Sequence, residues 1–271
     1  MKSLLVHVSG GPGEAARIEA ALKLARTFSG HLTFCQPAPP PLVAGGVAPG
    51  TLWSAVTFED IALKSEEVRA EQRAKIEAKM ANEDVPWDLQ MVSGFAQEAF
   101  VAHSGLYDLA IVSLNEEDYP FAADGPFLSH VVTHAACPVL ALPQDAGDFD
   151  PLGPALIAWD GSMEAASAVK AALGLLEKSS ALTALSVGQI VGKPHLSELA
   201  QYLSRHNLSV TTDAVPQEGH ISDTLVDAAT RLAASYIVMG AYGHSRVLQT
   251  ILGGETERML RQSKVPVLFG R

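Results

Sequence analysis

Four glycines lie within residues 238–260, which read VMGAYGHSRVLQTILGGETERML. Gly240 and Gly243 flank a turn after an apolar run, and Gly253 and Gly254 precede a helical pattern. Glycine lets the backbone approach a ligand closely, and the N–H groups at the start of a helix attract an anion. The pattern therefore favours phosphate binding, although strand-to-helix turns also use glycine, and both interpretations stay open at this point.

The elements that would position these glycines belong to an internal repeat. Residues 4–36 align with residues 155–187 without a gap, and the residues from Gly125 align in the same way with those from Gly253. The aligned segments read as apolar strands separated by amphipathic helices. The two halves therefore have the same predicted order of elements.

Short apolar runs that alternate with helical patterns predict five strands in each half and a mainly parallel sheet covered on both faces. The predicted fold class is α/β, with two tandem open-sheet, Rossmann-like domains at residues 1–145 and 152–271, joined by a linker at 144–154 that contains Gly, Pro and Asp. Ligands bind such sheets at the carboxyl ends of strands where the strand order reverses, and Gly240 follows a strand. The predicted helices cover residues 13–28, 58–82, 95–104, 126–135, 163–178, 195–206, 220–233 and 254–263.

Composition excludes several classes of partner. The chain has 271 residues and a formal net charge of −11, which argues against broad binding to nucleic acid because no basic stripe exists to neutralise phosphates. No apolar run approaches the length of a membrane helix, so no membrane is expected as a partner, and a cytoplasmic location is predicted. Cys35 and Cys137 lie in apolar runs and are predicted to be reduced core residues.

The pattern Gly240-x2-Gly243-x9-Gly253, followed by a helix and the strand KVPVLF, resembles the nucleotide signature G-x2-G-x9-G-(S/T) of the universal stress protein family. The segment AWDGSMEAASAVKAAL also resembles the first strand and helix of that family. The resemblance covers both halves, so the chain looks like a tandem universal stress protein with the fold of adenine nucleotide alpha hydrolase-like proteins. It implies a stress-response protein that binds ATP, with or without Mg²⁺, as a regulatory ligand.

Carried over to this sequence, the resemblance places Asp160 and the backbone of Trp159 near the adenine and ribose, and the main chain of Val187 at the adenine. The glycine segment and the start of the following helix would border the ribose and bind the phosphates. One departure is Gly254, which stands where the family often has Ser or Thr. The residues expected to bind the adenine nucleotide are Trp159, Asp160, Val187, Met239, Gly240, Gly243, His244, Ser245, Arg246, Gly253, Gly254, Glu255 and Thr256.

The first half departs from this pattern at the same positions. Ser9 replaces the aspartate at Asp160, and Ser113 replaces the glycine at Gly240. Residues 113–127 also contain several acids where phosphate would have to lie, and like charges repel. The first half is therefore predicted to keep the fold and lose the nucleotide. The contrast favours a ligand as the explanation for the glycines of the second half.

Alternatives to a regulatory ATP-binding role remain. Asp160 and Glu255 are the acids best placed to hold Mg²⁺ or orient water, which would suit a slow ATPase or a related nucleotide-using enzyme, yet no catalytic residue or metal site is predicted. A nucleotide-free scaffold that binds partner proteins is a further reading. The closing strands around 139–142 and 267–269 resemble edges that pair in the family, which would make one chain an intrachain pseudo-dimer and leaves a homodimer open.

Overall fold

The computed structural model describes residues 1–38, 55–114, 127–146, 149–241 and 254–270, and the side chains of all of these except 55–65. The N-terminal half provides β1 (Ser3–His7), α1 (Glu14–Phe28), β2 (His31–Ala38), α2 (Ala55–Met80), β3 (Trp87–Ser93), α3 (Ala96–His103), the 3-10 helix η1 (Ser104–Leu106), β4 (Leu109–Ser113), α4 (Phe127–His134) and β5 (Val139–Leu142). The C-terminal half provides β6 (Ala155–Ala158), α5 (Met163–Leu176), β7 (Leu182–Val187), α6 (Leu196–Arg205), β8 (Thr211–Val215), α7 (Ile221–Arg231), β9 (Tyr236–Gly240), α8 (Gly254–Gln262) and β10 (Val267–Gly270). These elements confirm the predicted α/β class.

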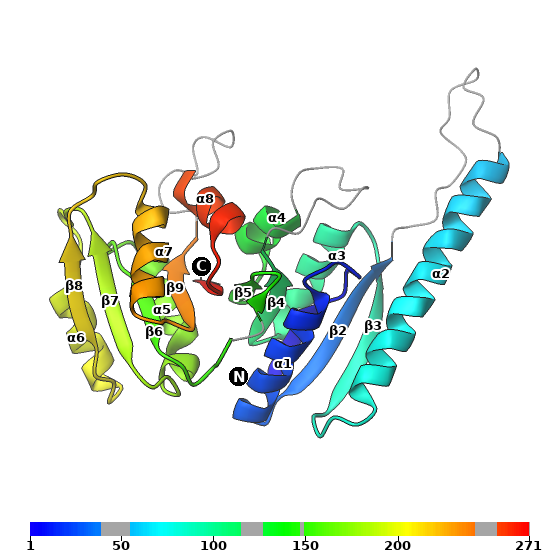
Figure 1. Ribbon diagram of the computed structural model, residues 1–271, viewed down its shortest axis with the longest axis horizontal. Coiled ribbons are helices and arrows are strands. Elements are labelled where there is room, and N and C mark those ends of the chain that lie inside the picture. Colours follow the sequence, from blue (N-terminus) through cyan, green and yellow to red (C-terminus); the bar gives the residue numbers. More distant parts are fainter. Residues whose placement is uncertain (39–54, 115–126, 147–148, 242–253, 271) are drawn as a thin grey trace, which may run out of the picture.

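All ten strands belong to one sheet, in the order β3-β2-β1-β4-β5-β10-β9-β6-β7-β8 (Figure 1). Within each half the printed strand pairs are parallel. The strand order reverses between β1 and β4 in the N-terminal half and between β6 and β9 in the C-terminal half. These two reversals are the positions at which the carboxyl ends of neighbouring strands open toward a ligand.

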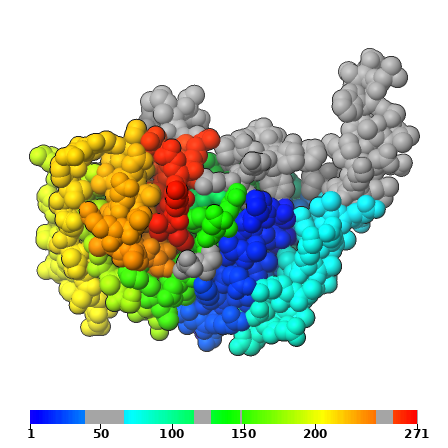
Figure 2. All heavy atoms as spheres, viewed as in Figure 1, coloured from blue at the N-terminus to red at the C-terminus, as the bar shows by residue number. Residues whose placement is uncertain are grey.

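The halves join through an antiparallel pair of strands. Val139 of β5 lies opposite Phe269 of β10, and the pairing continues along both strands. The sequence analysis expected a sheet in each half, with closing strands that could pair within the chain. The structure pairs these two strands, so the ten strands form one continuous sheet. Figure 2 shows the red end of the chain lying against its green middle part at this junction. Above the junction, Ser129 Oγ of α4 donates a hydrogen bond to Glu257 Oε2 of α8 at 3.2 Å.

The core consists of two layers, one on each face of the sheet, and both layers run through both halves. Alternate strand residues supply the two layers: Leu4 and Ile157 face the layer that contains α1, α2, α5 and α6, while Leu5 and Leu156 face the layer of α3, α4, α7 and α8. This alternation follows from the two-residue period of a strand. Sheet and helices thus hold both strand-order reversals in one rigid frame.

The segment between the halves is anchored at both sides. Lys23 Nζ of α1 donates to the Phe149 carbonyl at 2.8 Å, and the Phe149 ring packs edge-on against Tyr236 of β9. Ser235 Oγ accepts a hydrogen bond from the Asp150 N–H at 2.7 Å. The predicted boundary near 144–154 therefore coincides with a connection that contacts both halves.

Cys35 and Cys137 are both buried and unbonded to each other. Burial raises the pKa of Cys35 to about 12 and that of Cys137 to about 11, so both thiols stay protonated at neutral pH. Among the residues described, no helix is both long and apolar enough to cross a membrane.

Candidate functional site

The candidate site lies at the strand-order reversal of the C-terminal half. Asp160 follows β6, Gly240 ends the neighbouring strand β9, and Val187 ends β7 on the other side of β6. Since these strands are parallel, their carboxyl ends meet at one edge of the sheet. The structure therefore brings together three of the predicted residues that are far apart in the sequence.

Asp160 sits at the start of a tight turn that leads into α5. Its Oδ1 accepts a hydrogen bond from the Ser162 N–H at 2.9 Å, and its Oδ2 lies 3.7 Å from Lys193 Nζ. Gly161 has φ of +71°, a conformation that side chains disfavour, and Ser162 Oγ accepts from the Ala165 N–H as the N-cap of α5. The Asp160 side chain stays 61% exposed, so its carboxylate can still accept hydrogen bonds from a ligand.

Trp159 has a more internal role than predicted. Its backbone N–H donates to the Leu185 carbonyl at 2.9 Å, and its indole N–H donates to the Pro194 carbonyl at 3.0 Å. The side chain is only 7% exposed and belongs to the core. The Trp159 amide is thus used within the sheet, and the indole holds the segment around Pro194 in place.

Gly240 is explained by packing. A Cβ atom at this position would lie 2.6 Å from the Ala165 nitrogen and 2.6 Å from the Glu164 carbonyl carbon, both backbone atoms of the first turn of α5. Gly270, which pairs with Gly240 in the neighbouring strand, has the same problem with the backbone of Ala168. The inference that a ligand must explain Gly240 is therefore wrong, because α5 approaches the ends of β9 and β10 too closely for any side chain.

Gly254, by contrast, has no packing role among the described residues. It is exposed at the first position of α8, and a Cβ atom there would meet none of the described atoms within 4 Å. A serine, which the family often has at this position, would therefore fit without strain. The first backbone N–H groups of a helix have no partner within the helix, which is why a helix start can bind an anion.

Glu255 caps the neighbouring helix. Its Oε2 accepts from the Ser222 N–H at 2.8 Å, and its Oε1 lies 3.3 Å from His220 Nδ1, both at the start of α7. Burial alone would raise the pKa of Glu255, but the hydrogen bonds from Ser222, His220 and Ile221 outweigh burial and hold the pKa below its ordinary value. The Glu255 carboxylate is engaged by α7, which changes its predicted role as a group that holds Mg²⁺ or orients water.

The remaining predicted residues divide into two groups. Thr256 is 6% exposed and Met239 is 9% exposed, so each presents little side chain to a ligand. Five predicted residues lie outside the part of the chain that the structure describes, namely Gly243, His244, Ser245, Arg246 and Gly253. Their proposed contacts with phosphate rest on the sequence.

Residues 153–271 match the model of the Universal stress protein family. The C-terminal half is therefore similar to the universal stress protein family. The universal stress protein Slr1230 of Synechocystis sp. (strain ATCC 27184 / PCC 6803 / Kazusa) is 25% identical over 190 residues, which cover 66% of this chain and 63% of that protein. The match thus spans less than two thirds of that curated relative.

Solved structures extend the fold likeness to both halves. A universal stress protein from Archaeoglobus fulgidus DSM 4304 superimposes with a TM-score of 0.74 at 16% identity, covering 99% of this chain and 97% of that one. Protein PA1789 of Pseudomonas aeruginosa PAO1, which is described as functionally unknown, gives a TM-score of 0.60 at 18% identity, covering 99% and 92%. At this identity the likeness shows the fold, and it includes the N-terminal half, which the family model does not match.

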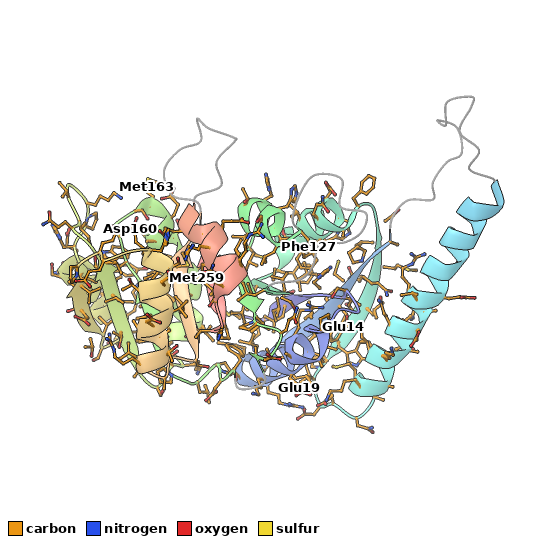
Figure 3. The ribbon with its side chains drawn as sticks, turned by 45° about the horizontal axis from the view of Figure 1, so that its top comes forward. Glu14, Glu19, Phe127, Asp160, Met163 and Met259 are labelled. Carbon is orange, nitrogen blue, oxygen red and sulfur yellow. The ribbon has the colours of Figure 1, made fainter. Side chains whose placement is uncertain are left out.

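The N-terminal half fills the equivalent position with its own side chains. Arg17 of α1 is fully buried; its Nη2 donates to Ser9 Oγ at 2.8 Å and its Nη1 donates to Ser113 Oγ. Glu14 Oε2 lies 3.7 Å from Arg17 Nη2 and accepts from the backbone N–H groups of Ser9 and Gly10, at 3.0 and 2.7 Å. In Figure 3, Glu14 and Asp160 mark the two reversals, in different halves of the molecule. In the N-terminal half, the polar groups of Ser9, Glu14, Arg17 and Ser113 therefore bond to one another.

Aromatic packing closes the same region further. The Phe127 ring, at the start of α4, stacks on His7 of β1 with centroids 4.1 Å apart, and Phe100 of α3 packs edge-on against both. Phe127 occupies the place in the repeat that Glu255 holds in the C-terminal half. The acidic segment at 115–126, which was expected to repel phosphate, lies outside the described residues.

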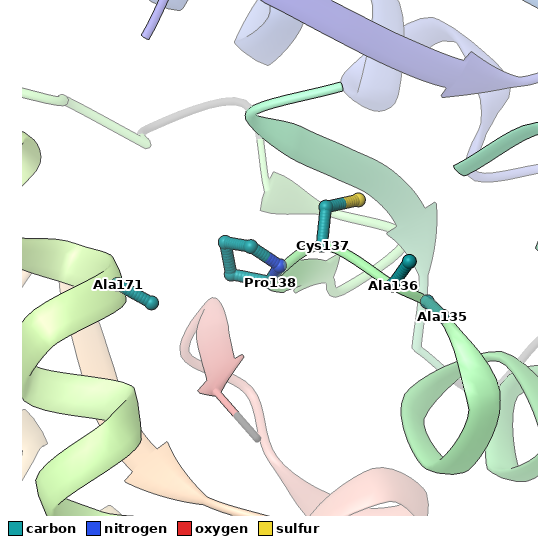
Figure 4. Close-up of a pocket in the computed structure, with 5 residues that line it drawn as sticks. All are labelled: Ala135, Ala136, Cys137, Pro138 and Ala171. Atoms are coloured by element: carbon teal, nitrogen blue, oxygen red, sulfur yellow. The ribbon is translucent and has the colours of Figure 1, made fainter. Parts of the chain in front are cut away.

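A hollow lies at the junction of the halves, away from the candidate site. Figure 4 shows Ala171 of α5 facing the turn before β5 across it, and its lining is Ala135, Ala136, Cys137, Pro138 and Ala171. These small side chains offer no charge to a phosphate, so this hollow does not correspond to the predicted nucleotide site. Among the residues that the structure describes, no group of three or more His, Cys, Asp or Glu side chains could hold a metal ion.

Lys193 is a candidate residue that no sequence pattern indicates. It lies on the segment between β7 and α6, and only the tertiary contact with Asp160 brings its ammonium group to the site. A pair of glycines, Gly188 and Gly192, is the one local signal that this segment makes unusual turns.

Proposed function

We propose that the C-terminal half binds an adenine nucleotide, ATP, as a regulatory ligand at its strand-order reversal, and that the protein acts in a stress response through this binding. The observation that carries the proposal is the exposed carboxylate of Asp160 beside Gly240, at the point where parallel strands diverge. The family match over 153–271 and the spacing of the glycines support the same ligand.

The chemistry of the edge suits the two ends of a nucleotide. An ionised carboxylate only accepts hydrogen bonds, so Asp160 suits ribose hydroxyl groups rather than phosphate. The exposed start of α8 at Gly254 offers backbone N–H groups and the positive end of a helix dipole, which suit phosphate oxygens. Ribose near β6 and phosphates toward α8 is therefore the orientation that we propose.

A regulatory role is favoured over catalysis by the partners of the two acids. Glu255 is held by hydrogen bonds from the start of α7, and Asp160 accepts from the Ser162 N–H and pairs with Lys193. A general base must be within hydrogen-bond reach of the water or hydroxyl that it activates. Because Glu255 is held by α7 and Asp160 is expected to bind the ribose, neither carboxylate is placed to activate water, and binding without rapid turnover is the expected behaviour.

The test uses the full chain, freshly purified, with the bound nucleotide released by denaturation and identified by mass spectrometry. Calorimetry with added ATP should then give a stoichiometry of one per chain. Asp160→Asn should weaken binding about tenfold, since a hydrogen bond to a charged group contributes about 1.5–3 kcal/mol. Gly243→Val should abolish binding by blocking the approach of the phosphates to the backbone.

Asp227→Asn is the matched control, because Asp227 is an exposed acid on α7 away from the reversal. It should bind ATP like the unaltered chain. Absence of nucleotide and of binding at millimolar ATP would overturn the proposal and favour the nucleotide-free scaffold. Rapid release of phosphate would favour the enzyme instead, and a stoichiometry of two would show that the N-terminal half also binds.

A further inference from the structure

The segment between β7 and α6 lies directly on the Asp160 turn. The Trp159 indole N–H donates to the Pro194 carbonyl at 3.0 Å, and Lys193 Nζ lies 3.7 Å from Asp160 Oδ2. A Cβ atom on Gly161 would lie 2.6 Å from the Pro194 carbonyl oxygen and 2.8 Å from Lys193 Cβ. These contacts fix the position of Lys193 at the edge of the candidate site.

The N-terminal half covers the equivalent turn with a neutral residue. Gly10 has the same φ of +71° as Gly161, and a Cβ atom on Gly10 would clash with the side chain of Gln72. Gln72, from α2, donates to the Ser9 carbonyl at 3.3 Å. The turn is thus covered in both halves. In the N-terminal half the neutral amide of Gln72 covers it, and in the C-terminal half the cationic Lys193 lies beside the exposed Asp160 carboxylate.

Charge decides what Lys193 can do at this position. The chain has a net charge of −11, and Asp160 adds an exposed negative charge where an anionic ligand would have to approach. Lys193 is 30% exposed and offsets that charge locally. An ammonium group beside the site attracts phosphate, and its effect grows with the charge of the ligand.

We propose that Lys193 is a specificity-determining residue of this site, which makes the site prefer a nucleotide bearing phosphates over the corresponding nucleoside. The proposal rests on the proposed function, because it concerns the same ligand. In the ligand-free chain Lys193 pairs with Asp160. In the complex the ribose hydroxyl groups take the Asp160 carboxylate, and the charge of the nearby ammonium group acts on the phosphate chain, which leads from the ribose toward α8.

The test measures dissociation constants of ATP, ADP, AMP and adenosine for the unaltered chain and for Lys193→Met, which keeps the aliphatic stem and removes the charge. Lys193→Met should weaken ATP binding about tenfold, or about 1.4 kcal/mol, with a loss that decreases from ATP to AMP, and should leave adenosine binding unchanged, because adenosine carries no charge for the ammonium group to attract. Lys193→Arg should retain ATP affinity. Added salt should weaken ATP binding less for Lys193→Met than for the unaltered chain.

Lys178→Met is the matched control, since Lys178 is an exposed lysine just beyond the end of α5. It should bind all four ligands normally. Equal weakening of ATP and adenosine by Lys193→Met would overturn the proposal and show that Lys193 only positions Asp160, and unchanged ATP binding would overturn it as well. Failure of the unaltered chain to bind ATP would overturn both this assignment and the proposed function, whereas ATP binding that ignores Lys193 would overturn this assignment alone.

Discussion

The two halves of the molecule build the same strand-order reversal and finish it differently. In the N-terminal half, Arg17 lies fully buried between α1 and the strand ends and bonds to the hydroxyl groups of Ser9 and Ser113. In the C-terminal half, α5 packs directly on the backbone at Gly240, and Asp160 remains 61% exposed. One half thus satisfies its polar groups internally, while the other presents a carboxylate to solvent.

The comparison also shows what the glycines do. A Cβ atom on Gly13 of the N-terminal half would lie 2.6 Å from Ser113 Oγ, and one on Gly240 would lie 2.6 Å from the Ala165 nitrogen. The repeat aligns Gly13 with Glu164 and Ser113 with Gly240, so each half places one glycine at this contact, on the helix side or on the strand side. A glycine at the strand end therefore reflects close packing, and the exposed carboxylate of Asp160 is the feature that distinguishes the C-terminal half.

The largest effect is expected from removing the internal network of the N-terminal half. Arg17→Ala should lower the free energy of unfolding by about 3–5 kcal/mol, because it removes a fully buried side chain, its hydrogen bonds to Ser9 and Ser113, and the positive charge beside Glu14. Arg231→Ala removes an exposed arginine from the last turn of α7 and should change stability by about 0.5 kcal/mol or less. Chemical denaturation measures the free energy of unfolding of both variants. A small decrease for Arg17→Ala would contradict the claim that the N-terminal half depends on its internal polar network.

A smaller loss of stability is expected from filling the contact between Gly240 and α5. Gly240→Ala should destabilise the protein by about 1–3 kcal/mol, since its Cβ would overlap backbone atoms of α5 that have little freedom to move. Gly254→Ala, where no atom lies within 4 Å, is the control and should not destabilise. In the N-terminal half, Gly13→Ala should also lower stability, because its Cβ would meet Ser113 Oγ, and adding Ser113→Gly should recover part of that stability. Thermal unfolding measures the stability of all these variants. If Ser113→Gly adds a further loss of stability to that of Gly13→Ala, the idea that each half needs one glycine at this contact is contradicted.

Glu255 should make the stability of the C-terminal half depend on pH. Glu255→Gln should cost about 1 kcal/mol at neutral pH, as expected for a carboxylate at a helix N-terminus. Because the folded-state pKa is lowered from the ordinary 4.5, the contribution is fully present above that pH and disappears as the pH falls through the folded-state pKa. Denaturation midpoints across acidic pH test this, and a difference between the two proteins that persists at low pH would show that the charge is not responsible.

The smallest effect concerns the departure from the family pattern. Gly254→Ser should bind ATP about threefold more tightly, because a restored hydroxyl adds one hydrogen bond to phosphate. The thermal midpoint should not fall, since the new side chain meets no neighbour within 4 Å. Calorimetry compares the two proteins, and Ser204→Ala, at the exposed end of α6, serves as a comparison that removes a hydroxyl away from the phosphate end. Weaker binding by Gly254→Ser would contradict the orientation proposed for the nucleotide.

Much of the fold could be predicted from the sequence. The helix predicted at 163–178 is observed at Met163–Leu176, and the one predicted at 195–206 at Leu196–Arg205, because apolar periodicity and capping residues act locally. Of the candidate site, the sequence predicted that Asp160 and Gly240 would lie at one edge, which follows from parallel strands. It did not predict that Glu255 caps α7 or that Lys193 reaches Asp160, since both contacts join separate elements.

The sequence by itself determined the repeat, the α/β class and the half that carries the nucleotide pattern. The periods of strands and helices and the spacing of glycines are local features that can be read from short segments of the chain. The tertiary structure decided which of these residues remain available to a ligand. Gly240 is committed to packing and Arg17 to burial, whereas Asp160 is exposed. Availability depends on what other segments place against a residue, and that is settled only when the chain folds.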